Sequence, residues 1–169
     1  VRLELVEGTG TVAPGVDVVE STDAEVARVV ELVLEHARTR PHESLGVVTL
    51  GRRHADLVRA AVRLALAQAP ELADVLERDA PEPLLVKAVD DAQGDTRDAV
   101  VLSVGFGRTP HGRVLHRFGP LAEAGGERRL AVAVTRARRR MTVVASFGPD
   151  DLDPERLSAR GPRLLRELL

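Results

Sequence analysis

The 169-residue sequence contains no cysteine and few aromatic side chains, with three Phe and neither Trp nor Tyr. Without cysteine there can be no disulfide and no thiolate metal site, which favours a reducing compartment, so we expect a cytoplasmic location. Few aromatics leave little material for the stacking platforms that single-strand binders commonly use. No apolar run approaches the roughly 20 residues that span a bilayer. No charged leader precedes an apolar core, so we expect neither a membrane partner nor a signal peptide.

Lysine is also nearly absent, because Lys87 is the only lysine in the chain. A P-loop has the pattern G-x-x-x-x-G-K-[ST], in which the lysine and the hydroxyl hold phosphate and Mg²⁺. Val86 and Ala88 flank Lys87, so the sequence contains no P-loop. The 24 basic residues are balanced by 26 acidic ones, which excludes a uniform basic field. Any attraction for phosphate must therefore be local.

Helical and extended apolar patterns alternate along the chain. Apolar residues at helical spacing, bounded by capping residues and proline, predict helices at 21–40, 53–69 and 71–77. Short β-branched runs predict strands at 45–50, 84–89, 99–106 and 141–146. This alternation predicts an α/β fold with an open, mostly parallel sheet. We expect an irregular or edge segment at 1–20, one domain at 18–150 and a helical tail at 151–169.

Open α/β sheets bind ligands at the carboxyl ends of their strands. That rule directs attention to residues 49–54, to the turn at 90–98 and to the segment 128–140. The last of these holds six arginines in a chain whose formal net charge is only −2.

We predict a helix at 127–137, which would place those arginines either on its outward face or at its end. Its apolar face would comprise Leu130, Ala133, Val134 and Ala137. Arg129 and Arg136, seven residues apart, would lie one above the other, and Arg138–Arg140 would oppose the macrodipole at the helix end. The pattern alone favours solvated arginines beside a core stripe, and a phosphate site is the alternative.

Three segments resemble, in the usual order, signature motifs of superfamily 1 helicases. "LGVVTLGRRHADLV" (45–58) occupies the place of motif IV, "VDDAQGDTRDAVVLSV" (89–104) resembles motif V, and "ERRLAVAVTRAR" (127–138) resembles motif VI. Over residues 18–146 the chain is most similar to the group of the nonsense-mediated-decay helicase and the replication helicase-nuclease. The resemblance implies a second, C-terminal RecA-like motor domain, with helices on both faces of its sheet and no P-loop of its own.

The resemblance implies a nucleotide-binding set made up of Gln93, Gly94, Asp95, Thr96, Arg129 and Arg136. Within it, Arg136 matches the arginine finger that reaches the γ-phosphate across the cleft between two motor domains, and is the only residue assigned a catalytic role. Such a guanidinium is worth about 10³–10⁵ in rate in well-studied nucleotide hydrolases. ATP and Mg²⁺ would be held mainly by a first motor domain that this sequence lacks.

The resemblance also implies a nucleic-acid-binding set, made up of Thr49, His54, Asp98 and Thr135. His54 stands where relatives often carry glutamine, although a histidine early in a helix is more often solvated. A turn-capping role for Asp98 is equally open. The partner would be single-stranded or duplex nucleic acid, with DNA favoured. The loop 108–126 holds three arginines and two histidines, so it could line the strand path or simply face solvent.

Three positions depart from the helicase pattern. Thr96 replaces a glutamate that contacts the ribose, Ala131 replaces an asparagine of motif VI, and Leu50 replaces an aromatic after the motif IV threonine. These changes leave open a non-catalytic binding module that has kept the helicase fold. An unrelated α/β enzyme is a further alternative, but no nucleophile–base–acid set or metal-ligand spacing supports it. We do not expect the isolated chain to hydrolyse ATP.

Overall fold

The computed structural model describes residues 1–12, 18–78 and 80–169. Within them one five-stranded sheet is entirely parallel, with strand order β1-β5-β4-β2-β3. Its strands are β1 (Arg2–Leu5), β2 (Leu45–Thr49), β3 (Leu85–Ala88), β4 (Arg97–Ser103) and β5 (Ala137–Ala145). The helices are α1 (Asp23–Thr39), α2 (Arg52–Ala67), α3 (Pro70–Ala73), α4 (Gly126–Val134) and α5 (Arg160–Leu168). The predicted α/β class is confirmed.

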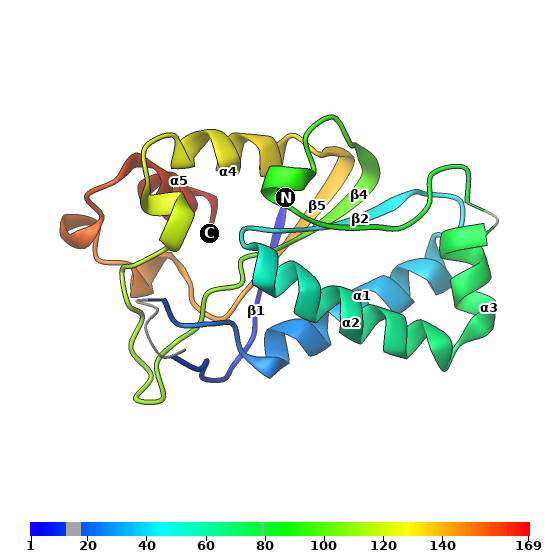
Figure 1. The fold of residues 1–169 in the computed structure, drawn as a ribbon, viewed down its shortest axis with the longest axis horizontal. Coiled ribbons are helices and arrows are strands. Elements are labelled where there is room, and N and C mark those ends of the chain that lie inside the picture. Colours follow the sequence, from blue (N-terminus) through cyan, green and yellow to red (C-terminus); the bar gives the residue numbers. More distant parts are fainter. Residues whose placement is uncertain (13–17, 79) are drawn as a thin grey trace.

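Helices cover both faces of the sheet (Figure 1), so alternate residues of each strand enter different cores. Val47 and Val101 pack with the valines of α1 and α2. Val48 and Leu102 face the other way, towards α4 and α5. Because both faces are covered, the central strands read as continuous apolar runs, which is why their positions could be predicted.

The connection between β3 and β4 comprises only residues 89–96. Ala88 lies level with Thr49 and Ser103 at the carboxyl edge of the sheet, whereas Arg97 lies level with Ala137 at the amino edge. Parallel strands ordinarily need a crossover of a dozen or more residues, usually a helix. This link instead begins with a short 3₁₀ turn, buries Val89 and Ala92 in the core, and runs back along the sheet. The segment similar to motif V therefore spans both edges.

The predicted arginine helix is too long, because α4 ends at Val134 and β5 already begins at Ala137. The Thr135 hydroxyl donates to the carbonyl oxygens of Ala131 (2.8 Å) and Val132 (3.0 Å), which competes with helix propagation. Pairing of Ala137 with Arg97 then draws the chain into the sheet. The expected stacking of Arg129 and Arg136 on one helix is therefore wrong.

Two further expectations for this segment also fail. Leu130 and Ala133 are buried as predicted, but the Val134 side chain is 38% exposed. Residues 138–140 are strand residues, so they do not oppose a helix macrodipole. Their charges are met by carboxylates instead, as where Arg140 Nη2 lies 2.5 Å from Glu43 Oε1.

Candidate functional site

Arg136 lies in the turn between α4 and β5, where its guanidinium contacts the link 89–96. Nη1 donates to the carbonyl oxygens of Asp95 (3.2 Å) and Ala92 (3.4 Å), and Nε donates to that of Val132 (2.9 Å). Nη2 donates to the Thr135 hydroxyl at 2.9 Å. All these acceptors are neutral, and within the described residues no carboxylate pairs with Arg136. Its positive charge is thus fixed in place without being neutralised.

The structure brings part of the predicted nucleotide-binding set beside Arg136. Gln93 and Gly94 are exposed on the link, and Gly94 has a φ of +89°, in the left-handed region that favours glycine. Asp95 pairs with Lys87, whose Nζ lies 2.8 Å from Oδ2. Thr96 is half-buried and its carbonyl accepts a hydrogen bond from Arg97 at 2.9 Å. Asp95 also touches Arg136 through its backbone, at the amino edge of the sheet.

Arg129, predicted to belong to the same set, lies elsewhere. Its Nε is 3.2 Å from Oδ1 of Asp90, at the other end of the link. The expectation that all these segments gather at the carboxyl edge is therefore wrong for residues 95–98 and for Arg136. The crossover is too short to hold a returning helix, so the link itself travels back to the amino edge.

The predicted nucleic-acid-binding residues also divide between the two edges. Thr49 is fully buried at the carboxyl edge, where its hydroxyl donates to the Gly51 carbonyl at 2.7 Å. His54 is at the same edge and 6% exposed. Thr135 is exposed beside Arg136. Asp98, at the start of β4, accepts hydrogen bonds from the backbone and hydroxyl of Ser44, both at 3.2 Å.

Arg138 completes the surroundings of Asp98. Its Nε donates to Asp98 Oδ1 at 3.2 Å, and this bond is the main reason that the Asp98 pKa lies below its ordinary value. Arg138 also pairs with Glu82, whose pKa is lowered to about 2, chiefly by that hydrogen bond. Asp98 thus holds the amino ends of β4 and β5 to the residue before β2.

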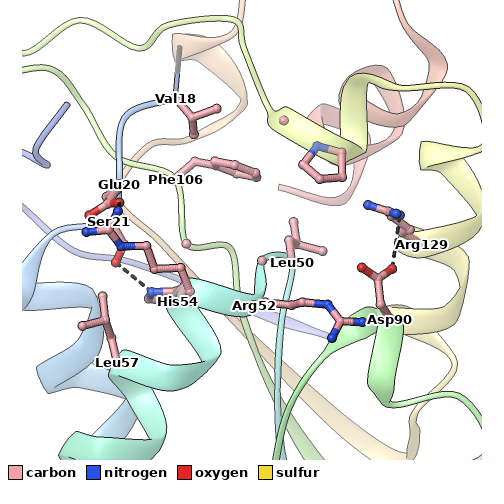
Figure 2. Close-up of a pocket in the computed structure, with 15 residues that line it drawn as sticks. Val18, Glu20, Ser21, Leu50, Arg52, His54, Leu57, Asp90, Phe106 and Arg129 are labelled. Carbon is pink, nitrogen blue, oxygen red and sulfur yellow. Dashed lines mark hydrogen bonds and ion pairs between the residues drawn. The ribbon is translucent and has the colours of Figure 1, made fainter. Parts of the chain in front are cut away.

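A cavity of about 380 Å³ opens at the carboxyl edge of the sheet (Figure 2). Its lining comes from the residues before α1, from the turn after β2, from α2, from the link, from the loop after β4 and from α4. Its apolar walls are formed by Val18, Leu50, Leu57, Phe106 and Pro120. Its charged rim is formed by Glu20, Arg52, Arg53, Asp90 and Arg129.

Each arginine on this rim is paired with a carboxylate. Besides the Arg129–Asp90 pair, Arg53 Nη1 lies 2.6 Å from Glu20 Oε1, and Arg52 Nη2 lies 2.9 Å from Asp91 Oδ1. The Arg52 and Arg53 side chains remain 67% and 69% exposed, so both can reorient. The resting cavity therefore carries little net charge.

A buried chain of hydrogen bonds runs from the cavity into the protein. Ser103 donates its hydroxyl proton to Glu25 Oε1 at 2.6 Å, and the Gly105 N–H donates to the same oxygen at 2.8 Å. Because the Ser103 proton is used in this way, His54 Nε2 donates to Ser103 Oγ at 2.7 Å. His54 Nδ1 then accepts from the Ser21 hydroxyl at 2.9 Å, as drawn in Figure 2.

Burial favours the neutral form of both ionisable groups in this hydrogen-bonded series. Glu25 is fully buried, which raises its pKa to about 7, and its Oε2 has no hydrogen-bond partner within the described residues. Burial lowers the pKa of His54 to about 4. None of the sequence motifs described above includes Glu25. Its spacing of four and eight from the buried Val29 and Val33 was the signal that its side chain points inward.

Comparisons with known proteins give the class of the chain. A family model described as "AAA domain" matches residues 17–147, so the chain belongs to this family, which is the C-terminal region of superfamily 1 helicases.

Two curated relatives are similar over most of the chain. One is the uncharacterized ATP-dependent helicase MG140 of Mycoplasma genitalium, 33% identical over 131 residues, which are 75% of this chain and 11% of that protein. The other is the MG140 homolog of Mycoplasma pneumoniae, 29% identical over 150 residues, which are 86% and 13%. The chain therefore spans about an eighth or less of these relatives. The C-terminal domain of a possible DNA helicase from Lactobacillus plantarum superposes with a TM-score of 0.48 at 16% identity, over 83% of this chain and 75% of that chain.

The described residues include neither a membrane-spanning helix nor a cluster of metal-ligating side chains. None of the helices within 1–12, 18–78 and 80–169 is long and apolar enough to cross a membrane. Nor do three or more acidic or histidine side chains in that part of the chain come together as a metal would require.

Proposed function

We propose that the chain is the second motor domain of an ATP-dependent helicase or translocase and that Arg136 is its arginine finger. The observation that carries this proposal is the guanidinium of Arg136, which is held by neutral acceptors and keeps its charge for an anion. Arg138 and Arg140, by contrast, are each committed to a carboxylate. A positive charge positioned in this way stabilises the charge that develops on a transferring phosphoryl group.

ATP and Mg²⁺ would be bound mainly by a first motor domain. The residues beside Arg136 suit phosphate and polar contacts rather than a metal, since Gln93 is an exposed amide and Asp95 is already paired with Lys87. When bound, Mg²⁺ would neutralise phosphate charge. This chain would supply Arg136 and the exposed turn at Gln93 and Gly94, and nucleotide would bind weakly to the chain alone.

Nucleic acid would run along the carboxyl edge, where Thr49 and His54 lie. Contacts there would position the strand by its phosphates rather than read its sequence. Asp98 and Thr135 remain predicted contacts, although both lie at the other edge. DNA is the partner that we favour, in the cytoplasm, and competition between DNA and RNA oligonucleotides of the same sequence tests that preference.

The decisive experiment measures nucleic-acid-stimulated ATP hydrolysis by the full-length protein. Arg136→Lys keeps the charge but loses the planar fork, and Arg136→Gln keeps hydrogen bonding without the charge. We expect Arg136→Gln to lower kcat by about 10³-fold with oligonucleotide binding unchanged. Arg128→Gln is the matched control, because Arg128 is an exposed arginine of α4.

Each result has a definite meaning. Equal kcat for wild type and Arg136→Gln would refute the arginine finger. Strand binding with no hydrolysis by the wild type would instead identify a non-catalytic module that has kept the helicase fold, as Thr96 and Ala131 allow.

A further inference from the structure

We propose that the cavity at the carboxyl edge receives one unstacked nucleobase of a bound single strand. This inference rests on the proposed function and adds a contact to the bases themselves. At about 380 Å³ the cavity falls within the range of small-molecule sites, about 300–1,000 Å³. Figure 2 shows Val18, Leu50 and Phe106 converging on it from separate segments.

The charge of the cavity favours a neutral, planar occupant. Its interior is apolar, and each of its rim arginines is already paired with a carboxylate. The phosphate of a free anion or of a nucleoside triphosphate would have to enter that apolar interior without its water. A heterocyclic base can fill the interior while its own sugar and phosphate stay at the rim.

The rim is suited to a strand that continues past the cavity. Arg52 and Arg53 are mostly exposed, so they can turn from Asp91 and Glu20 towards the phosphates on either side of the inserted base. Of the apolar wall residues, Pro120 belongs to the loop 108–126, and one of the two open interpretations of that loop is that it lines the strand path. A nucleic-acid strand on that path would pass the mouth of the cavity.

Aliphatic side chains would contribute most of the contact. Phe106 is 8% exposed and packs edge-on against Phe118, with ring centroids 5.3 Å apart, so only part of its ring is available to a base. Leu57, at 47% exposure, is more accessible than Val18, Leu50 and Phe106. The chain would thereby hold a base despite its shortage of exposed aromatics.

Helix α2 offers a matched pair of variants. Leu57 and Leu64 are both exposed leucines seven residues apart, but only Leu57 lines the cavity. We would measure binding of the full-length Leu57→Ala and Leu64→Ala proteins to a fluorescent single-stranded oligonucleotide by anisotropy. The same backbone with abasic sugars in place of nucleosides is the second probe.

Base insertion predicts that the wild type binds the normal strand about 5–10-fold more tightly than the abasic strand. Leu57→Ala should lose most of that preference and Leu64→Ala should keep it. Equal binding of both strands by wild type and both variants would overturn the nucleobase cavity and leave strand binding intact. No binding of either strand by the wild type would refute the proposed function itself. Displacement of the base by free nucleoside monophosphate would assign the cavity to a mononucleotide and likewise overturn the proposal.

Discussion

The contributions of Glu25 and His54 to the pH dependence of the free energy of unfolding should cancel. Between about pH 4.5 and 6.5, their ordinary pKa values, an unfolded chain carries Glu25 as the anion and His54 as the cation. The folded chain holds both neutral in that range, because burial raises one pKa to about 7 and lowers the other to about 4. Both states then bind the same number of protons, so this pair adds no slope to the free energy of unfolding.

Replacing either residue should make the free energy of unfolding depend on pH through the ionisable group that remains. In Glu25→Gln only His54 remains, and the unfolded state binds one more proton, so stability falls as the pH drops from 6.5 towards 4. In His54→Gln only Glu25 remains, and the folded state binds one more proton, so stability falls as the pH rises from 4.5 towards 7. Each pKa departs by two to three from its ordinary value, so each effect amounts to about 3 kcal/mol in full. Near pH 5.5 the opposed slopes should each approach about 1.4 kcal/mol per pH unit.

Urea unfolding followed by circular dichroism, at constant ionic strength from pH 4.5 to 7, measures these slopes. The quantity to compare is the free energy of unfolding of each variant relative to wild type at every pH. Glu35→Gln is the control, because Glu35 is an exposed carboxylate of the same helix. Slopes of the same sign in both variants, or flat differences, would refute the assignment of a neutral buried pair.

Three further predictions concern single residues, and Gly51→Ala serves as the control for the first of them. Gly105→Ala should lower the free energy of unfolding by about 2 kcal/mol or more, since a Cβ there lies 2.7 Å from His54 Cδ2 at a φ of +77°. Gly51→Ala, in open space with a φ of −135°, should change it by under about 1 kcal/mol in the same denaturation assay. Phe118→Ala should cost about 3–5 kcal/mol by urea unfolding because Phe118 is fully buried, and a cost under about 1 kcal/mol would contradict its place in the core. Arg138→Ala should raise the pKa values of Glu82 and Asp98 in an NMR titration, and unchanged values would show that other groups hold them low.

The parallel sheet could be predicted because β2 and residues 99–102 of β4 are buried on both faces and are therefore mainly apolar. The position of Arg136 could not. Helical spacing continues to Ala137, and nothing in the pattern shows that the Thr135 hydroxyl and the pairing of β5 with β4 end the helix first. The charged rim could not be predicted either, since the Arg129–Asp90 pair joins α4 to the link, two segments that are far apart in the sequence. Secondary-structure propensity describes each segment alone. The end of α4 and the ion pair at the rim depend instead on contacts between segments.

The link 89–96 connects the cavity rim to Arg136. At one end, Asp90 and Asp91 form ion pairs with arginines beside the cavity. At the other end, the carbonyls of Ala92 and Asp95 accept hydrogen bonds from Arg136. A helical crossover would place several helical turns between the cavity rim and Arg136. Here the link 89–96 connects the two sites directly. A bound nucleic-acid strand that displaces the rim would also displace the peptide units whose carbonyls hold the Arg136 guanidinium. We therefore expect that inserting a few glycines into the link 89–96 would leave both nucleic-acid binding and ATP hydrolysis measurable. Nucleic acid should then no longer stimulate the hydrolysis.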